Sequence, residues 1–363
     1  MINIKFAASC ATISALSACA LSTQVAQAAD SQASAYARTA PRIQMMMRGA
    51  HRVQLRRPIA SPVSSSTSPN FSFFDMPWST DTEAGGLNLG VGGVASHVVG
   101  CYVPNSSRAG LDDGFEYTLT THSSTKSSAT FDVIGPTNVG LCAFGINDSG
   151  VVVGSYFLSP DGDAPEPGFV LDGTTLTQIN APYANNCITI PESINDAGTA
   201  VGEYEMNTDC TAEGGWSEAG FSWSNGTFSQ IPSYPGSIDS TVSGINSAGD
   251  MVGGALNGTE TADIGWLLKG GVFTPINYPG FVFTEPLAIN DSDEIVGFYC
   301  TGSFADCQDT GPYLGFLYKN GTFTTIAVPG VTGTYLYGIN NKGEISGEYE
   351  DTNGYWHSFL VKP

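Results

Sequence analysis

Carboxylates are the residues of this sequence whose type and spacing could do chemistry. Asp161-Gly162-Asp163 is the local segment that most resembles a calcium-binding loop, because calcium takes hard oxygen ligands from flexible loops. The segment lacks the spaced ligands of a complete EF-hand loop. We therefore predict calcium, held by Asp161 and Asp163, as the candidate metal, and we predict no other cofactor.

No grouping of nucleophile and base stands out beside these acids. The chain holds no Gly-x-Ser-x-Gly motif, and its histidines after residue 70 are His97, His122 and His357. Because the residues of a catalytic triad come together only in the fold, this pattern makes a hydrolase less expected but does not exclude one. Zinc is not indicated, because no close Cys-x-x-Cys or paired His spacing occurs. We predict no catalytic residue.

The elements that must position the acids repeat along the chain. A six-residue turn, typified by Gly338-Ile339-Asn340-Asn341-Lys342-Gly343, has earlier copies whose asparagines are Asn147, Asn195, Asn246 and Asn290. Successive asparagines lie 48, 51, 44 and 50 residues apart, and a fixed period of this length is typical of propellers and solenoids. Asn and Asp favour tight turns and Gly takes the left-handed position, so each copy predicts a hairpin turn.

One copy departs from this pattern. Asp293 stands where the other copies have the closing Gly. Asp tolerates the left-handed region better than most residues that carry a side chain. We therefore expect this turn to form like the others.

Each unit predicts four short antiparallel strands, which is the content of a propeller blade. A Pro usually lies 11 residues before the turn Asn, and the same spacing joins Pro77 to Asn88, which adds a sixth, degenerate unit. The last unit ends at Pro363 after three strands, whereas Phe71 to Pro77 indicates an isolated strand before the first unit. We predict an all-β, six-bladed β-propeller over residues 71–363, with the N-terminal strand completing the last blade and closing the ring.

Three segments of the repeat resemble a known family. The patterns Gly-Ile-Asn-Asn-x-Gly-x-Ile-x-Gly-x-Tyr, His-x-Phe-Leu and Phe-Thr-Thr-Ile-x-x-Pro-Gly are similar to the bacterial extracellular repeats of the HAF family, named after a His-Ala-Phe signature, over roughly residues 71–363. His357 keeps the histidine, whereas other units have Pro167, Ala219, Ile264 or Leu314 at or near this position. The resemblance implies export and a repeat fold, and it implies no established chemistry.

In a ring closed in this way, the loops that enter the innermost strands and the loops between second and third strands share one face, the upper face. The latter loops hold 15 of the 33 carboxylates that follow residue 70. We predict a ligand face there, with two tryptophans that could stack on sugar rings; its candidate residues are Asp112, Asp113, Glu166, Asp209, Glu213, Asp263, Asp306, Asp309, Asp351, Trp78 and Trp216. The competing interpretation is that solvated acids keep an exported protein soluble.

The start of the chain indicates export. Residues 1–28 combine an apolar stretch from Phe6 to about Leu21 with small residues at Ala26-Gln27-Ala28, which predicts an export signal. Leu16-Ser17-Ala18-Cys19 offers a lipoprotein box as the alternative. Residues 29–70 are rich in Arg, Ser and Pro and predict a disordered tether. We expect an extracellular or periplasmic protein, with an outer-membrane lipoprotein as the alternative.

Charge and cysteine content support the same compartment. The propeller carries 33 acidic and 6 basic residues, so nucleic acid is a poor partner, and a cationic ligand fits better. Six cysteines follow the export signal, an even number that suits an oxidising compartment. Of the 15 arrangements that six cysteines permit, we predict the pairs Cys300–Cys307, Cys187–Cys210 and Cys101–Cys142.

These observations predict an exported binding or interaction module that acts through its acidic upper face. Its ligand is an unidentified extracellular or surface component, its only membrane contact would be a lipid anchor, and we expect a monomer. The alternative is a secreted hydrolase or lyase acting on a carbohydrate or lactone with a metal-assisted site in the central channel. An enzyme of this kind needs acids or histidines that converge at the axis, whereas a binding module needs only a rim.

Overall fold

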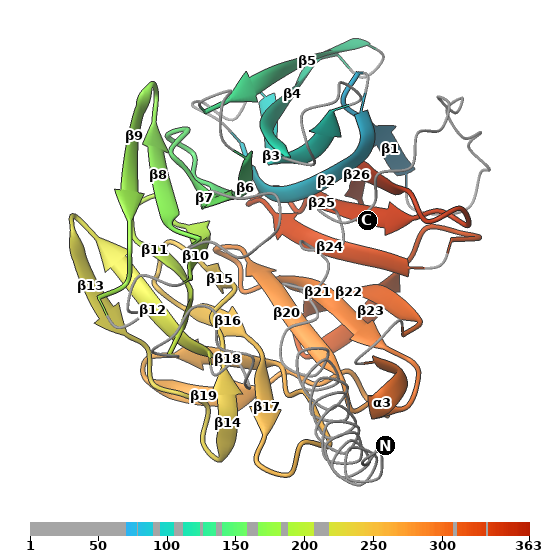
Figure 1. The fold of residues 1–363 in the computed structure, drawn as a ribbon. Coiled ribbons are helices and arrows are strands. Elements are labelled where there is room, and N and C mark those ends of the chain that lie inside the picture. The colour runs from blue at the N-terminus through green and yellow to red at the C-terminus, as the bar shows by residue number, and fades with distance from the viewer. Residues whose placement is uncertain are drawn as a thin grey trace, which may run out of the picture.

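The computed structural model shows a ring of six small β-sheets around a central axis (Figure 1). It describes residues 70–77, 79–89, 95–104, 112–123, 126–135, 140–157, 166–182, 188–206, 218–307, 311–331 and 333–363. The predicted export signal and nearly all of the predicted tether lie outside the described residues. In the described part of the chain, no helix is both long enough and apolar enough to cross a membrane.

Four strands in chain order build each of the first three blades. Blade 1 holds β2 (Ser79–Asn88), β3 (Ala95–Pro104), β4 (Asp113–Ser123) and β5 (Lys126–Ile134). Blade 2 holds β6 (Gly140–Ile146), β7 (Val152–Phe157), β8 (Gly168–Asp172) and β9 (Thr175–Ile179). Blade 3 holds β10 (Thr189–Ile194), β11 (Ala200–Glu205), β12 (Glu218–Ser224) and β13 (Thr227–Gln230).

Blade 4 departs from the predicted pattern because its two inner strands are interrupted. The innermost strand is divided into β14 (Ser237–Ser240) and β15 (Gly244–Ile245), and the next into β16 (Met251–Gly253) and β17 (Ala255–Asn257). β18 (Trp266–Lys269) and β19 (Val272–Pro275) complete it. Other inner strands contain a register shift at the corresponding place, and in blade 4 this irregularity breaks the strand.

Blades 5 and 6 complete the ring. Blade 5 holds β20 (Thr284–Ile289), β21 (Ile295–Cys300), β22 (Tyr313–Lys319) and β23 (Thr322–Ile326), with the short helix α3 (Phe304–Cys307) before β22. Blade 6 has the order β24 (Gly333–Ile339), β25 (Ile345–Glu350), β26 (Trp356–Lys362) and β1 (Asn70–Phe74). The first strand of the chain therefore forms the outer edge of the last blade, which confirms the predicted fold and its closure.

A chain of asparagine side chains ties the innermost strands together on the face opposite the upper face, which we call the lower face. The Nδ2 group of each turn Asn donates to the backbone carbonyl of the next one, from Asn88 through Asn147, Asn195, Asn246 and Asn290 to Asn340. The Oδ1 atom accepts two backbone N–H groups of its own turn, as at Asn195. Each Asn thus shapes its own hairpin and fastens it to the neighbouring blade.

The spacing of Pro and Asn has a local cause on the upper face. Six residues before the turn Asn, a Thr or Ser hydroxyl accepts the N–H of the residue that immediately precedes the Pro. This bond recurs in five blades, with hydroxyl residues Thr82, Thr189, Ser240, Thr284 and Thr334. The hydroxyl fixes the path by which the chain enters the innermost strand, and the Pro stiffens that path.

Each blade also buries one aromatic side chain of its third strand completely. These residues are Phe115, Phe169, Phe221, Trp266, Phe316 and Phe359. A small residue precedes each of them, and at Gly220 an added Cβ would lie 2.5 Å from the Val242 side chain of the next blade. The third strand therefore begins in close contact with the neighbouring blade, at the contact zone between blades that we call a seam.

Candidate functional site

An acidic residue stands at the start of the third strand in four consecutive blades, two positions before the small residue just described. We call Asp112, Glu166, Glu218 and Asp263 the seam acids. The backbone carbonyls of Asp112, Glu166 and Asp263 accept N–H groups from the entry of the next innermost strand, at distances of 3.0, 2.9 and 3.3 Å. At the third seam the Glu218 N–H donates to Asp239 Oδ1 at 2.8 Å. The strands between which these acids sit are side by side in the ring (Figure 1).

The third seam is the most acidic. Glu218 is 3% exposed and Asp239 is 6% exposed. Glu218 Oε2, Asp239 Oδ2 and Asp263 Oδ1 are buried and have no hydrogen-bond partner among the described residues. A buried carboxylate without a partner is costly to keep ionised. This cost raises the pKa values of the buried carboxyls.

Burial is the largest cause of the pKa shifts at the seams. It raises the pKa of Asp112, Glu166, Asp239 and Asp263 to about 7. Glu166 reaches this value although the Ser155 hydroxyl donates to its Oε1 at 2.5 Å, which acts to lower the pKa. Burial, followed by the charges of Glu203 and Asp239, raises the pKa of Glu218 well above its ordinary value. Asp112, Glu166, Asp239 and Asp263 therefore change charge near neutral pH.

The lysines whose side chains the structure describes lie on the lower face. Lys269 pairs with Asp250 and Asp293, Lys319 pairs with Glu294, and Lys362 lies 4.0 Å from Glu344. Each of these lysines stands at the end of a third strand, next to the Asn turns. Within the described residues, no lysine therefore compensates the seam acids of the upper face. Among the described residues, the lysine ion pairs thus lie on the lower face and the seam acids lie on the upper face.

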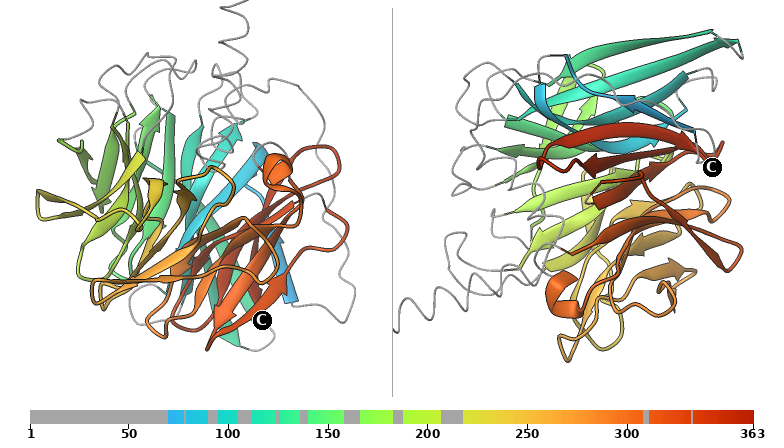
Figure 2. Two further views of the ribbon diagram at one scale, coloured as in Figure 1. Left: turned by 90° about the horizontal axis from the view of Figure 1, so that it is seen from below. Right: turned by 90° about the vertical axis from the view of Figure 1, so that its right-hand side faces the viewer.

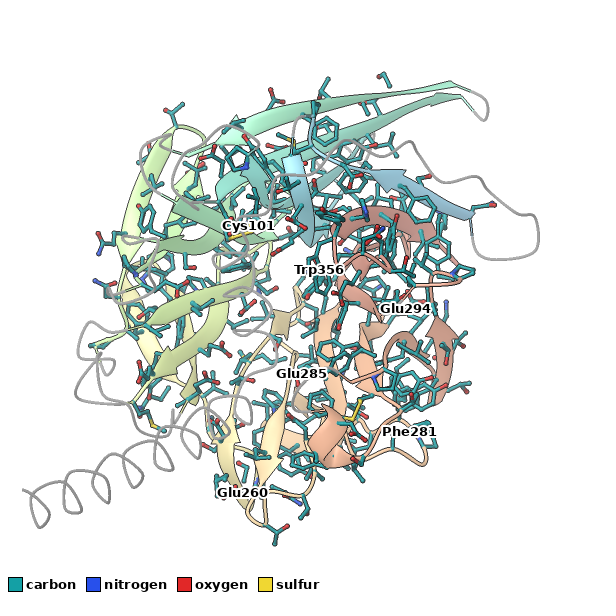
Figure 3. The ribbon with its side chains drawn as sticks, turned by 45° about the vertical axis from the view of Figure 1, so that its right-hand side comes forward. Cys101, Glu260, Phe281, Glu285, Glu294 and Trp356 are labelled. Carbon is teal, nitrogen blue, oxygen red and sulfur yellow. A yellow bond between two sulfur atoms is a disulfide. The ribbon has the colours of Figure 1, made fainter. Side chains whose placement is uncertain are left out.

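Aromatic side chains replace the acids at the other two seams. Tyr313 and Trp356 occupy the equivalent positions in blades 5 and 6. Tyr335 lies between them, with its ring centroid 5.4 Å from that of each. Figure 3 labels Trp356 and Glu285, which come from adjacent blades near the axis. The upper face thus joins an acidic sector, blades 1 to 4, to an aromatic sector, blades 5 and 6.

The predicted site residues fall into separate environments. Asp112, Glu166 and Asp263 are seam acids, and Asp113 accepts a hydrogen bond from the Tyr102 hydroxyl at 3.5 Å. Asp306 is engaged within its own loop by Ser303, and Asp351 accepts the N–H groups of Asn353 and Tyr355. The remaining predicted residues, Asp161, Asp163, Asp209, Glu213, Asp309, Trp78 and Trp216, lie outside the described residues.

Two of the predicted disulfides are present. Cys101 of β3 is joined to Cys142 of β6, which links blade 1 to blade 2, and Cys300 is joined to Cys307 across α3. The third predicted pair, Cys187 and Cys210, lies outside the described residues. Figure 3 shows the first disulfide beside the Cys101 label. It lies at the seam that holds Asp112.

Metal-ion geometry is restricted in the described part of the chain. One group of three candidate ligands there has ligand atoms that all lie within 4.8 Å of one another, and it consists of Cys101, Asp112 and Cys142. This group lies at the seam between blades 1 and 2.

The innermost strands also surround an open cavity of about 650 Å³ at the level of the Asn turns. Register shifts in the innermost strands bring Phe144, Glu192, Leu287 and Tyr337 into its lining. Among the described residues that line it, none is histidine. The buried acid Glu192 lines this cavity, whereas none of the four seam acids does.

Sequence reasoning did not single out the most acidic seam. Glu218 and Asp239 were not among the candidate ligand residues, and Glu83 was not considered. One signal was available, because Asp or Glu stands two residues before the Gly of the third strand in four units. Such acids look like ordinary loop residues until the neighbouring blade is known to cover them.

No protein-family model matches this sequence, and no curated protein matches it. Among solved structures, the chain is similar to the β-propeller domain of the Trilobed protease from Pyrococcus furiosus (8% identity, TM-score 0.42, 78% of this chain and 94% of that chain). It is similar to a gluconolactonase from Xanthomonas campestris (9% identity, TM-score 0.44, 79% of this chain and 88% of that chain). It is also similar to the acylaminoacyl peptidase from Pyrococcus horikoshii (10% identity, TM-score 0.42, 78% of this chain and 52% of that chain), of which it spans about half the length. At these values the comparisons bring no function to this chain, and its propeller fold rests on the strand pairing.

Proposed function

We propose that this protein is an exported binding module whose upper face takes a cationic ligand. The observation that carries the proposal is the row of seam acids in four consecutive blades; Asp112, Glu218 and Asp263 each hold a buried carboxylate oxygen that no described residue engages. A ligand that brings ammonium or guanidinium groups to these oxygens would supply the missing hydrogen bonds and charge.

The spacing of the acids supports an extended ligand. Successive seam acids belong to successive blades, so a cationic peptide or polyamine lying along the upper face would meet one after another. The formal charge of −27 that the sequence gives to residues 71–363 favours the approach of such a ligand. The aromatic sector next to the acids, with Tyr313, Tyr335 and Trp356, offers apolar surface to the alkyl parts of the ligand.

Export supports the proposal from a different side. The disulfides Cys101–Cys142 and Cys300–Cys307 suit an oxidising compartment, and residues 1–28 have the pattern that predicts an export signal. Calcium at Asp161 and Asp163 stays a separate prediction. A cationic peptide does not require it.

Binding of a hexalysine peptide by the full mature protein tests the proposal. The measurement is isothermal titration calorimetry at pH 8, where carboxyls with a pKa of about 7 are mostly ionised. We expect binding that weakens as salt is added. The double variant Glu218→Gln/Asp263→Asn should bind at least tenfold more weakly.

The matched control is Asp132→Asn/Asp172→Asn, which removes the same charge from two exposed residues, one in the outer strand β5 and one at the end of the third strand β8. It should bind hexalysine nearly as well as the unsubstituted protein. Equal loss in both variants would show that only net charge matters and would overturn a site at the seams. Absence of hexalysine binding by the unsubstituted protein would also overturn the proposal. Circular dichroism of each variant checks that the sheets are intact.

A further inference from the structure

The seam between blades 1 and 2 gathers four side chains of distinct chemistry. They are Glu83 of β2, Cys101 of β3, Asp112 just before β4 and Cys142 of β6. The Cys101 Sγ atom lies 4.0 Å from Glu83 Oε2, and the Cys142 Sγ atom lies 4.0 Å from Asp112 Oδ2. Each sulfur of the disulfide is therefore flanked by one carboxylate.

In this arrangement, buried carboxylates lie beside a disulfide that cannot donate a hydrogen bond to them. Cys101 is 4% exposed, Cys142 is 1% exposed and Asp112 is 7% exposed. A disulfide sulfur has no proton to donate, and Asp112 Oδ1 has no hydrogen-bond partner among the described residues. The neighbouring charges of Asp81 and Asp113 oppose ionisation of Asp112. A cation held between the sulfurs and the carboxylates would satisfy all of these groups.

We propose that reduction of the Cys101–Cys142 disulfide turns this seam into a binding site for a thiophilic divalent cation such as Zn²⁺. The Cys101 and Cys142 thiolates and the Asp112 carboxylate are its ligands, and Glu83 is placed to complete the set. The site shares Asp112 with the cationic-ligand surface proposed above, but it adds two sulfur ligands and forms only in the reduced protein.

The chemistry balances in two steps. A dithiol reductant transfers two electrons and two protons to the disulfide, which yields two thiols while the reductant becomes a disulfide. The metal ion then replaces the two thiol protons, which pass to solvent. Thiolates select zinc over calcium or magnesium, which prefer oxygen ligands only.

The geometry needs little adjustment. With zinc–sulfur bonds of about 2.3 Å and zinc–oxygen bonds of about 2.0 Å, a tetrahedral site places sulfur and oxygen ligands roughly 3.5 Å apart. The two observed sulfur–oxygen distances of 4.0 Å are close to this value. Once reduction breaks the S–S bond, the two sulfurs separate because they are no longer held at bonding distance. The strands that carry the ligands are held by sheet pairing, with Glu83 directly opposite Cys101.

Cobalt substitution tests the site in the full mature protein. The protein is reduced with a water-soluble phosphine without oxygen and titrated with Co²⁺. We expect one equivalent of Co²⁺ to give a thiolate-to-metal charge-transfer band and the visible bands of tetrahedral cobalt, and Zn²⁺ to abolish both. The oxidised protein should give neither band.

Two cysteine variants locate the signal. Cys101→Ser/Cys142→Ser should lose the cobalt bands, whereas the matched control Cys300→Ser/Cys307→Ser should keep them. Asp112→Asn leaves both sulfurs in place and should bind Co²⁺ at least tenfold more weakly. Reduced protein that gives no bands, or bands that survive in Cys101→Ser/Cys142→Ser, would overturn the proposal. Asp112→Asn that binds Co²⁺ as tightly as the unsubstituted protein would remove the carboxylate from the ligand set and overturn the site as stated.

Discussion

At the scale of single residues, the seam acids make the stability of the protein depend on pH. Burial raises the native pKa of Asp112, Glu166 and Asp263, and of the neighbouring Asp239, to about 7, which exceeds the value near 4 of an unfolded carboxyl. Between these values the native state binds more protons than the unfolded state, so the free energy of unfolding falls as pH rises from about 4 to 7. Above that window it levels off, because both states are ionised.

We therefore expect a higher thermal midpoint at pH 5 than at pH 8 in scanning calorimetry. Glu218→Gln, which removes the charge at the most acidic seam, should stabilise the protein at pH 8 by about 1–3 kcal/mol and have little effect at pH 4. The exposed Asp132→Asn serves as the control and should have little effect at either pH. A Glu218→Gln variant that is less stable than the parent at pH 8 would contradict this account.

The turn asparagines predict an effect of opposite sign. Asn195→Ala removes the donor to the Asn246 carbonyl at 3.0 Å and the acceptor of the Ala197 and Thr199 N–H groups. Because the contact to Asn246 is buried and the two turn contacts are partly buried, we expect the free energy of unfolding, measured with urea, to fall by about 3 kcal/mol. Asn195→Asp keeps the acceptor of the turn and loses only the donor. If the ring contact matters as well as the turn, Asn195→Asp should also destabilise the protein, by a smaller amount.

The turn residues could be predicted from the sequence, whereas the state of the seam acids could not. Asp293 adopts φ of +56° in its turn, and its N–H donates to Asn290, as the closing Gly does elsewhere. That outcome depends on four consecutive residues. The burial of Glu218 depends on Asp239 in the following blade, and no local pattern contains this contact.

At the scale of elements, the closure of the ring depends on β1 and the loop that follows it. Phe71 and Phe73 of β1 pack against Phe359 of β26. His357 Nδ1 lies 3.1 Å from Asp75 Oδ2, and its Nε2 lies 3.8 Å from Asp351. Burial lowers the pKa of His357, but the hydrogen bond to Asp75 and the nearby acids outweigh it and raise the pKa. Protonated His357 therefore fastens the N-terminal segment to the last blade.

Because the folded pKa of His357 is raised, its stabilising effect is complete below about pH 6.5 and disappears as pH rises through the folded value. We expect His357→Gln to cost about 1 kcal/mol at pH 5.5 and to match the parent protein at pH 9 in thermal unfolding. Asp75 is half exposed, which keeps the expected effect small. An equal cost at both pH values would mean that His357 acts through packing and not through charge.

The strands could be predicted where the turn residues and the alternation of apolar and polar residues lie within one short segment of the sequence. Four strands per unit and the role of β1 follow from the turn spacing and from the missing strand of the last unit. The interruption of blade 4 and the helix α3 were not predicted, since both depend on how a segment fits against its neighbours. The hydroxyl that accepts the N–H before each Pro was present in the sequence in five units, and its role became clear only from the contacts.

At the scale of the whole molecule, the chain separates charge along the ring axis. The described lysines meet acids on the lower face, whereas the seam acids gather on the upper face. Figure 2 shows the ring from the side, with its strands running between these two faces. The sequence predicted a concentration of acids in the loops of one face. It did not predict that several would be buried, because burial arises only when six separate sheets are brought into contact.

The path of β1 has a consequence for orientation. Asn70 pairs with Lys362, at the lower face, and the chain then runs toward the upper face to enter β2. The described chain therefore enters the propeller at the lower face. If the segment before Asn70 holds the protein to a cell surface, as the lipoprotein alternative predicts, the lower face carries the point of attachment. The acidic sector of the upper face then points away from the cell surface and is accessible to ligands in the surrounding medium.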